Sequence, residues 1–292
     1  MRYKVYIIIA TLAWGSSFVV TKDVSAFVST AQILLTRFTA AIPIVALVFH
    51  KRLEHFLDPE HVWRGLVLGC VTFLAFYFQV RGLTFTTPGK NAFLTSAYCI
   101  IVPFLVWAMF GRKPTAYNIV AALLCIVGVG FISLDDSLRL ELGDSITLIG
   151  SLFYALQFVL LARFSRGRCV FTLTIWYFVG TSACSLAAML LFENPVPPTS
   201  IPVNAWLELA HLAVVVTAMA LVLQNLSLAH LSASTASLLS SLECVFAVLM
   251  SIAVGAEMLS PRIVTGFIIM FAGIMVSEAL PQLRRQSDAS ES

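Results

Sequence analysis

Residues Asn91–Phe110 read NAFLTSAYCIIVPFLVWAMF, twenty consecutive residues without one charged side chain. A helix of roughly 20 apolar residues crosses the hydrocarbon core of a bilayer. The stretch is too long for a strand of a membrane barrel, which needs about 9–11 residues, and it lacks strict alternation. We therefore predict a transmembrane helix here.

Nine further apolar runs of similar length follow the same pattern. Polar breaks such as Asp58-Pro59-Glu60 and Gly111–Pro114 separate them, and the weakest break is Leu231-Ser232. The sequence thus predicts an all-α membrane protein with ten transmembrane helices. The predicted spans are Val5–Thr21, Thr30–Phe49, Val62–Gly82, Asn91–Phe110, Ala116–Leu134, Ser145–Ala162, Val170–Phe192, Ala205–Ala229, Ala233–Val254 and Pro261–Leu280.

The composition agrees with lipid as the main solvent. Hydrophobic residues make up 59% of the 292 residues and charged residues only 11%, whereas a soluble domain has roughly 45–50% and about 25%. The net charge of +3 is too small to indicate a nucleic-acid partner. The first apolar run contains Trp14 and has no small-x-small cleavage site after it, so we interpret it as a retained helix rather than a signal peptide.

The distribution of Lys and Arg predicts the orientation. If the N-terminus is cytoplasmic, twelve of these residues fall in cytoplasmic segments, five fall on the opposite side, and Arg37 lies within a span. Short cytoplasmic loops carry the excess of positive charge in membrane proteins. We therefore predict a multi-pass protein of the plasma (inner) membrane with both termini in the cytoplasm and a polar cytoplasmic tail at 281–292.

The two halves of the chain resemble each other at a constant offset of 145 residues. The register runs without a gap through three consecutive predicted helices and predicts two five-helix repeats, at 1–135 and 144–280. Since five is odd, the second repeat enters the membrane from the opposite face, an architecture common among secondary transporters. The identical pairs are Thr72/Thr217, Ala75/Ala220, Gln79/Gln224, Leu83/Leu228, Leu94/Leu239, Ser96/Ser241, Cys99/Cys244, Ala108/Ala253 and Gly128/Gly273.

Two ionisable side chains lie well inside predicted spans, Arg37 and Glu243. A charge at such depth costs about 2.5–3.5 kcal/mol on insertion scales, so it usually faces the bundle interior or a wet cavity. Glu243 is the candidate for binding a substrate amine and for proton coupling. Arg37 is the candidate for meeting a substrate carboxylate or for pairing with Glu243. The alternative for both is an internal ion pair or a structural network.

Aromatic residues at similar depth complete the predicted substrate site: Trp14, Tyr77, Tyr98, Tyr154 and Trp176. Trp14 and Tyr154 occupy similar places in the first helix of each half, which favours them for a central cavity. Packing and hydrogen bonding between helices, ordinary in membrane bundles, is the alternative for these residues.

No motif indicates a cofactor or a metal. The six cysteines mostly sit in apolar runs without a close Cys-x-x-Cys pair, and the histidines near residue 55 have no metal-site spacing. Nucleotide-binding and hydrolase motifs are absent from the sequence. We therefore predict no metal, no cofactor and no enzymatic activity. The pair Gly65 and Gly69 favours close approach of a neighbouring helix.

The chain resembles the EamA-type proteins of the drug/metabolite transporter superfamily over nearly its whole length. The family pattern usually has a proline after the glutamate at position 243, where this chain has Cys244, so the bend expected there is in question. The resemblance implies ten helices, two EamA repeats and export or exchange of metabolites such as amino acids. It rests on Ala13–Phe18, Arg37-Phe38, Ser232–Ala247, Gly255-Ala256-Glu257 and Gly266 with Gly273.

The function expected from these patterns is secondary transport of small polar metabolites by alternating access. The expected partners are a small-molecule substrate and the lipid bilayer, and the sequence contains no support for a homodimer. A multi-pass membrane enzyme or receptor is the second hypothesis. It is disfavoured by the few deep ionisable residues and by a tail too short for a signalling domain.

Overall fold

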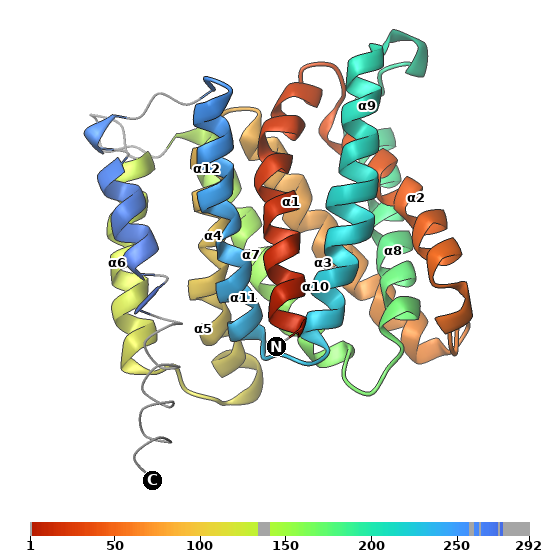
Figure 1. Cartoon of the computed structure of the whole chain (residues 1–292), viewed down its shortest axis with the longest axis horizontal. Coiled ribbons are helices and arrows are strands. Elements are labelled where there is room, and N and C mark those ends of the chain that lie inside the picture. Colours follow the sequence, from red (N-terminus) through yellow and green to blue (C-terminus); the bar gives the residue numbers. More distant parts are fainter. Residues whose placement is uncertain (1, 134–140, 257–259, 263, 274, 277–292) are drawn as a thin grey trace.

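The computed structural model describes residues 2–133, 141–256, 260–262, 264–273 and 275–276. Its helices lie side by side in one bundle (Figure 1). The helices of the first half are α1 (Arg2–Val24), α2 (Thr30–Val48), η1 (His50–Arg52), α3 (Pro59–Leu83), α4 (Pro88–Ser96), α5 (Tyr98–Phe110) and α6 (Ala116–Ser133). Those of the second half are α7 (Leu142–Phe164), α8 (Val170–Phe192), η2 (Pro198–Ser200), α9 (Val203–His211), the π-helix η3 (Leu212–Met219), α10 (Ala220–Leu228), α11 (Ala233–Ser241) and α12 (Glu243–Ala253).

Each predicted span has a helical counterpart. Within the described ranges, eight helices are long and apolar enough to cross a membrane, and the shorter apolar helices Ala116–Gly128 and Val264–Gly273 account for the fifth and tenth spans. The predicted all-helical membrane fold is confirmed. Residue 134, residues 274 and 277–280 of the last span, and the predicted tail 281–292 lie outside the described residues.

The two halves run through the membrane in opposite directions. The last turn of α1 contains Lys22, which bonds to the backbone of Thr86, and the Thr86 hydroxyl bonds to Asp144 at the start of α7. The end of the first helix of one half therefore meets the beginning of the first helix of the other. The end of the bundle that holds residue 2 is called the N-terminal end, and the end that holds Lys22 is called the opposite end.

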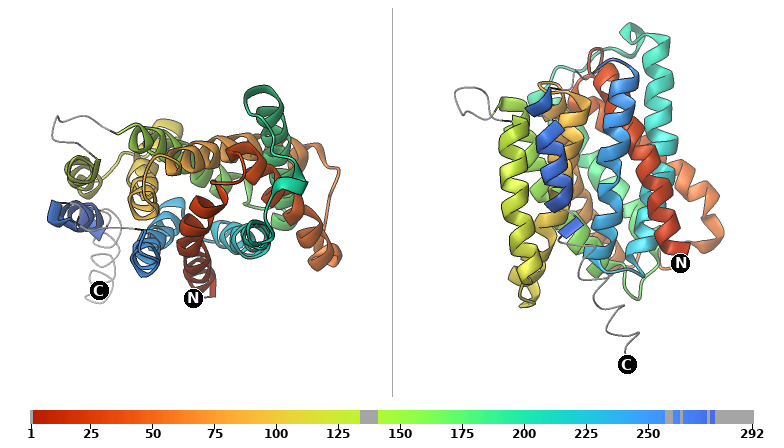
Figure 2. Two further views of the ribbon diagram at one scale, coloured as in Figure 1. Left: turned by 90° about the horizontal axis from the view of Figure 1, so that it is seen from above. Right: turned by 60° about the vertical axis from the view of Figure 1, so that its left-hand side comes forward.

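The halves are interleaved and do not form separate bodies. Helix α3 packs against α7 and α8, α2 packs against α8, and α1 lies between α10 and α12 (Figure 2). The largest buried side chains, among them Phe38, Phe158 and Phe178, belong to one core that draws on both halves. Residues of the two repeats consequently meet at the centre of the bundle.

Small residues permit the closest of these contacts. A Cβ atom on Gly65 would lie 2.3 Å from Cβ of Trp176, and one on Gly69 would lie 2.6 Å from the carbonyl oxygen of Tyr177 and 2.7 Å from Cα of Gly180. The Gly-x-x-x-Gly pair of the sequence thus serves the contact of α3 with α8 inside the chain.

Two membrane-spanning helices are interrupted in the middle, at equivalent positions of the repeats. Helix α4 gives way to α5 at Ala97, and α11 gives way to α12 at Leu242, which is 145 residues later. Both breaks contain tight i−3 hydrogen bonds, from Ile100 N to Ala97 O at 3.1 Å and from Val245 N to Leu242 O at 3.1 Å. The interruption beside Glu243 therefore forms without the proline of the family pattern. Half-helices of this kind commonly border the substrate site of transporters.

Candidate functional site

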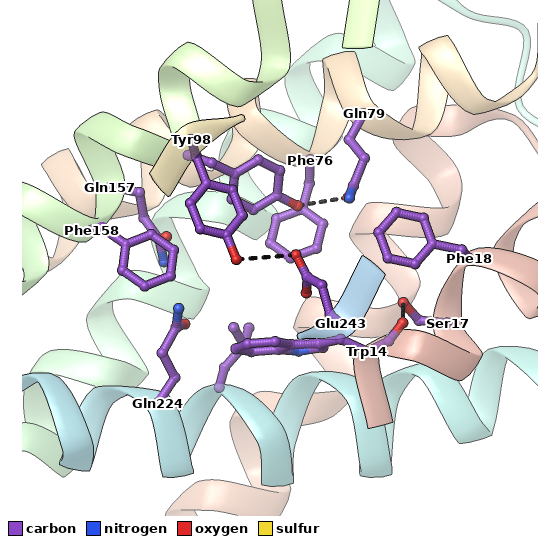
Figure 3. Close-up of a pocket in the computed structure, with 12 residues that line it drawn as sticks. Trp14, Ser17, Phe18, Phe76, Gln79, Tyr98, Gln157, Phe158, Gln224 and Glu243 are labelled. Carbon is purple, nitrogen blue, oxygen red and sulfur yellow. Dashed lines mark hydrogen bonds between the residues drawn. The ribbon is translucent and has the colours of Figure 1, made fainter. Parts of the chain in front are cut away.

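A narrow cavity lies at the centre of the bundle, between the two helix breaks. Its volume is about 30 Å³, which is room for about two water molecules. The side chains that line it come from both repeats and are mostly aromatic or uncharged polar groups, with one carboxylate (Figure 3). They are Trp14, Ser17, Phe18, Phe76, Gln79, Tyr98, Tyr154, Gln157, Phe158, Leu221, Gln224 and Glu243.

The twelve lining residues form six pairs of equivalent positions. In the first two helices of each half the offset is 140 residues, and from the third helix onward it is 145 residues, because the second half has five more residues than the first between the equivalent parts of its second and third helices. The cavity therefore lies on the pseudo-twofold axis that relates the repeats. The pairs are Trp14/Tyr154, Ser17/Gln157, Phe18/Phe158, Phe76/Leu221, Gln79/Gln224 and Tyr98/Glu243.

Glu243 is the carboxylate of the cavity. Its side chain is 6% exposed, and Oε1 accepts a hydrogen bond from the hydroxyl of Tyr98 at 3.3 Å. Both residues begin the second half of an interrupted helix, α12 for Glu243 and α5 for Tyr98. The breaks thus aim the first side chain of each half-helix at the partner repeat, and the buried carboxylate of Glu243 lines the cavity.

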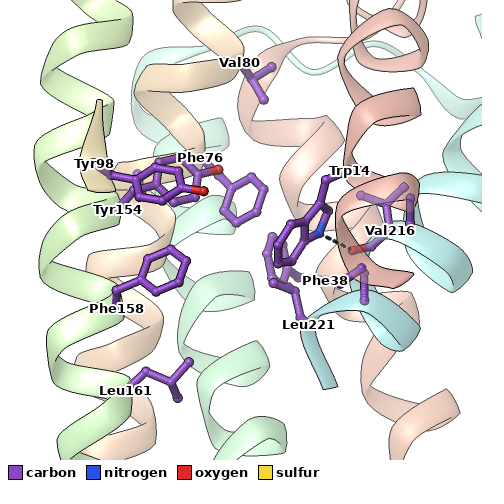
Figure 4. Packing of buried hydrophobic residues seen from close by; sticks show 14 of the residues in the cluster. Trp14, Phe38, Phe76, Val80, Tyr98, Tyr154, Phe158, Leu161, Val216 and Leu221 are labelled. Carbon is purple, nitrogen blue, oxygen red and sulfur yellow. Dashed lines mark hydrogen bonds between the residues drawn. The ribbon is translucent and has the colours of Figure 1, made fainter. Parts of the chain in front are cut away.

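Aromatic rings form one wall of the cavity. Tyr98 stacks on Phe158 with ring centroids 4.9 Å apart, and Phe76 meets Tyr154 edge to face at 5.2 Å (Figure 4). The Tyr154 hydroxyl donates to Oε1 of Gln79 at 2.6 Å. Such amphipathic walls accept both the apolar body and the polar groups of a small solute.

The π-helix η3 supplies partners to two residues of the first repeat. The indole N–H of Trp14 donates to the carbonyl oxygen of Val216 at 3.3 Å, and Nε of Arg37 donates to Oγ1 of Thr217 at 2.8 Å. Oγ1 of Thr217 in turn donates to the Leu212 carbonyl at 2.7 Å. Segments of π-helix often occur at functional sites, because their wider turn frees backbone groups from the regular ladder.

Arg37 and Glu243 do not form the ion pair that was one alternative from the sequence. Arg37 is 2% exposed and borders a second small space beside the cavity, and none of the ion pairs within the described ranges includes it. The guanidinium lies 4.8 Å from the ring centroid of Phe76 and 5.6 Å from that of Phe38. The buried charge is therefore held by rings and a hydroxyl.

The structure brings together only some of the candidate site residues. Trp14, Tyr98, Tyr154 and Glu243 line the cavity. Tyr77 borders a surface depression near Glu193 at the opposite end, and the Trp176 indole donates to the Phe56 carbonyl at 2.7 Å near the N-terminal end. Neither Tyr77 nor Trp176 is among the residues that line the cavity. The substrate contacts predicted for the other residues stay predictions.

Eight lining residues were not among the predicted site residues. Four are polar and lie at the depth of the site: Ser17, Gln79, Gln157 and Gln224. Phe18, Phe76, Phe158 and Leu221 look like ordinary core residues in the sequence. The second register, with its offset of 140 residues, is the signal that points to the Phe18/Phe158 pair, because it aligns this pair with Trp14 and Tyr154.

Hydrogen bonds and ion pairs close the opposite end. Nζ of Lys22 donates to the carbonyl oxygens of Leu83, Thr84 and Thr86 at 2.7, 3.1 and 2.9 Å. A cation at the C-terminus of a helix satisfies carbonyls that have no partner within the helix. Lys22 thereby ties the end of α1 to the end of α3.

A second lysine continues this closure between the repeats. Nζ of Lys90 lies 3.1 Å from Oδ2 of Asp144 and 2.7 Å from Oε2 of Glu141. Asp144 is fully buried and also accepts a hydrogen bond from the Thr86 hydroxyl at 3.0 Å. Together, the contacts of Lys22 with the carbonyl oxygens and of Lys90 with Asp144 and Glu141 are called the lysine latch. The sequence placed Lys90 and Asp144 in loops, and tertiary packing buries them.

Within the described residues, the N-terminal end does not repeat the lysine latch, although Arg168 pairs there with Glu60 of the other repeat at 2.7 Å. The repeat positions that correspond to Lys22 and Lys90 are Ala162 and Thr235, which carry no charge. Ala162 borders a vestibule of about 460 Å³ between the ends of α5 and α7 and the start of α11. Three exposed arginines line this vestibule: Arg112, Arg163 and Arg166. It lies one to two turns along α7 from the cavity residue Phe158.

Comparisons with known proteins agree with this architecture. A model of the EamA-like transporter family matches the chain twice, at residues 1–134 and 141–278. An "uncharacterized transporter" of Archaeoglobus fulgidus is 30% identical over 272 residues, which cover 92% of this chain and 83% of that protein. The "uncharacterized transporter YyaM" of Bacillus subtilis is 22% identical over 288 residues, 95% of this chain and 94% of that one.

A solved crystal structure has the same fold. It superposes with a TM-score of 0.74 at 16% sequence identity and covers 97% of this chain and 98% of its own. At this identity the likeness concerns the arrangement of the helices alone.

Proposed function

The chain belongs to the EamA-like transporter family, and from that premise we propose that it is a secondary transporter that exports or exchanges small polar metabolites by alternating access. The single observation that carries this proposal is the central cavity, whose twelve lining residues are six equivalent pairs of two inverted repeats. A site on the symmetry axis stays in place when the repeats exchange conformations, so it can face either side in turn.

The two ends of the bundle support this mechanism. The lysine latch ties the opposite end together, and the arginine-lined vestibule approaches the cavity at the N-terminal end. In a carrier this is the conformation open toward the N-terminal side. We propose that this side is the cytoplasm, as the positive charge of its loops indicates, and that the membrane is the plasma (inner) membrane.

Glu243 is the proposed coupling residue. Within the described part of the chain it is the carboxylate of the cavity, and the hydroxyl of Tyr98 is a neutral partner that leaves its charge uncompensated. A carboxylate in this position can take up a proton on one side of the membrane and release it on the other. It can instead bind a cationic group of the solute, and both roles place it in contact with the transported species.

The second hypothesis, a membrane enzyme or receptor, has less support. An acid–base pair needs two groups within hydrogen-bond reach of one reacting atom. In the described part of the chain, no histidine and no second carboxylate is hydrogen-bonded to Glu243. The family assignment also favours transport.

The direct test is reconstitution of the purified protein in liposomes that contain a pH-sensitive dye. Pools of amino acids, organic acids, amines and nucleosides are offered to the wild type and to Glu243→Gln. The proposal expects saturable flux of at least one pool with a proton signal, and loss of both in Glu243→Gln. Gln keeps the size of the side chain, so a matched melting temperature shows that the fold is intact.

Two other outcomes have clear meanings. If Glu243→Gln transports with unchanged pH dependence, the protein is a carrier in which Glu243 has a structural role. If no pool moves in the wild type while the protein is folded and inserted, the balance shifts to the enzyme or receptor hypothesis.

A further inference from the structure

We propose that Arg37 is the carboxylate-binding group of a second substrate subsite, so that the transported solutes carry a carboxylate. The subsite is the small chamber that Arg37 borders between the central cavity and the lysine latch. The proposal rests on the transport function proposed above and deepens it, because it names the chemical class of the solute.

The first argument is the uncompensated charge of Arg37. The side chain is 2% exposed, and Nη2 has no hydrogen-bond partner in the described part of the chain. Within the described residues its polar contact is the single bond from Nε to Thr217, and the ring of Phe76 lies over the guanidinium. A buried cation without an anion is costly, and a protein retains it where a ligand supplies the missing charge.

The second argument is the space beside the guanidinium. The chamber is small, with a volume of about 10 Å³, roughly the room of one water-sized group, and it shares Ser17, Phe18 and Gln79 with the central cavity. A solute in the cavity can therefore extend one end into the chamber without crossing a wall. Leu83 borders the chamber on its far side, and its carbonyl oxygen accepts a hydrogen bond from Lys22 of the latch.

The third argument is the way in which Arg37 is oriented. Thr217 binds Nε, so the outer nitrogens of the guanidinium remain available for a planar anion. Thr217 is itself fixed by its bond to the Leu212 carbonyl within the π-helix. Arginine presents two parallel N–H groups to a carboxylate in a fixed fork, which lysine cannot do.

The two repeats differ at the positions of Arg37 and Glu243, so the proposed carboxylate subsite exists in the first repeat only. The position equivalent to Arg37 is Tyr177, whose hydroxyl accepts a hydrogen bond from Nε2 of Gln157 at 3.3 Å. The position equivalent to Glu243 is Tyr98. Each repeat thus contributes one charge, positive from the first and negative from the second. These charges are unpaired with each other and both face space that a solute can occupy.

The route to the chamber has the matching charge. The vestibule at the N-terminal end carries Arg112, Arg163 and Arg166 on its walls, which raises the local concentration of anionic solutes. An anion that enters there passes Glu243 before it reaches Arg37. A zwitterion places its ammonium at Glu243, whereas a simple carboxylate needs Glu243 to be protonated. Binding of a simple carboxylate should therefore require uptake of a proton, and binding of a zwitterion should not.

The test compares solutes that share a carbon skeleton. Leucine has both charged groups, 4-methylpentanoate has only the carboxylate, and 3-methylbutylamine has only the amine. Phenylalanine, 3-phenylpropanoate and 2-phenylethylamine form an aromatic set. Binding is measured on purified protein in detergent by ligand-induced stabilisation and by quenching of tryptophan fluorescence. The variants are Arg37→Met, Arg37→Gln and Arg37→Lys, and Arg81→Met is the control because it removes an arginine that does not border the chamber.

The expected result has two parts. Probes with a carboxylate should stabilise the wild type and Arg81→Met, whereas probes with only an amine should not. Arg37→Met and Arg37→Gln should bind carboxylates at least tenfold more weakly than the wild type. The affinity of Arg37→Lys should lie between that of the wild type and that of these two variants. In the absence of ligand, Arg37→Met melts at the same temperature as the wild type or higher, because no internal ion pair is broken. If Arg37→Met does not fold, Arg37→Gln and Arg37→Lys decide the affinity part.

Several results would overturn the subsite. The subsite is wrong if the wild type and Arg37→Gln bind carboxylates equally well, or if only the amines bind. It is also wrong if no carboxylate binds, or if all three Arg37 variants melt at a much lower temperature than the wild type without ligand. A preference for the zwitterion identifies amino-acid-like solutes, whereas equal binding of the simple acid identifies carboxylates in general.

Failure of this proposal and failure of the transport function can be told apart. Arginine-dependent carboxylate binding without flux in liposomes retains the subsite and overturns transport. Flux of amines or nucleosides that is equal in the wild type and in Arg37→Gln retains transport and overturns the subsite.

Discussion

Tyr98 and Glu243 occupy equivalent positions of the two repeats, 145 residues apart, and the hydroxyl of Tyr98 donates a hydrogen bond of 3.3 Å to Oε1 of Glu243. Each residue starts the second half of a helix that breaks in the membrane, after Ala97 and after Leu242. The duplicated scaffold thus brings one position of its sequence into contact with its own copy. A carboxylate on one side and a phenol on the other make this contact asymmetric, so the proton coupling proposed for Glu243 would involve one repeat only.

The Tyr98–Glu243 contact predicts a non-additive mutant cycle. A hydrogen bond to a charged group contributes about 1.5–3 kcal/mol, so Tyr98→Phe should lower the rate of proton-coupled flux by roughly tenfold or more. Once Glu243→Gln has removed the charge, the further loss from Tyr98→Phe should be less than about threefold, because the shared interaction is gone. Proton flux into liposomes measures all four proteins. Additive losses would show that Tyr98 acts independently of Glu243.

The lysine latch predicts a change in accessibility. Lys90→Met leaves the buried carboxylate of Asp144 without this partner, and breaking a buried pair costs about 3–5 kcal/mol. The conformation in which the opposite end is closed should therefore become less populated. In a cysteine-free background with Ser17→Cys as reporter, an impermeant maleimide added from the opposite side should label Lys90→Met several-fold faster than the parent protein.

A matched control for the latch is Arg64→Met. Arg64 forms an ion pair with Glu60 at 3.1 Å near the N-terminal end, where the carboxylate is exposed. Exposed pairs contribute about 0–1 kcal/mol, so the labelling rate should stay the same. Equal labelling of Lys90→Met and Arg64→Met would show that the latch does not hold the opposite end closed.

The contact of α3 with α8 predicts a loss of stability from a single methyl group. A Cβ atom on Gly69 meets backbone atoms of Tyr177, Gly180 and Thr181 at 2.6–2.7 Å, and backbone cannot rotate away. Gly69→Ala should therefore cost about 1–3 kcal/mol through overpacking and lower the melting temperature in detergent by several degrees. Cys70→Ala, at the next and exposed position, is the control and should melt within a degree of the wild type. A Gly69→Ala protein as stable as this control would mean that α3 and α8 are farther apart than described.

The arginines of the vestibule predict a salt-dependent affinity. Changing Arg112, Arg163 and Arg166 together to Gln should raise KM for an anionic solute by roughly 3–10-fold at low ionic strength and leave kcat unchanged, because these groups concentrate the solute and do not hold it in the cavity. At about 0.5 M salt the difference should largely vanish, since screening shortens the reach of exposed charges. A loss that persists at high salt would indicate direct binding.

Much of the fold could be predicted from the sequence because lipid as solvent imposes strict rules. Every span needs a long apolar run, and runs such as Asn91–Phe110 and Thr30–Phe49 satisfy this need unambiguously. The repeat register then predicted the inverted arrangement. It also predicted the depth of Arg37 and Glu243, because position within a span gives distance from the membrane surface.

The rotation of each helix could not be predicted in the same way. In α1, Ile7 and Ala10 are buried whereas Ile8 and Leu12 are exposed, and all four are apolar. Lipid is as apolar as the bundle core, so a membrane helix has no amphipathic stripe that reveals its inner face. Their similar depth in the membrane therefore predicted Trp176 as well as Trp14 for the substrate site, although of these two only Trp14 lines the cavity.

The sequence by itself determined that this is a duplicated membrane protein of ten helices with two deep charges, because hydropathy and repeat register are properties of the chain alone. Only the tertiary structure decided that Glu243 meets Tyr98, that Arg37 borders a chamber without an ion pair to any described residue, and that Lys22 and Lys90 close one end. These relationships depend on which faces of distant helices meet. That choice is made by close packing of side chains across the interleaved repeats, where small residues such as Gly69 set the spacing.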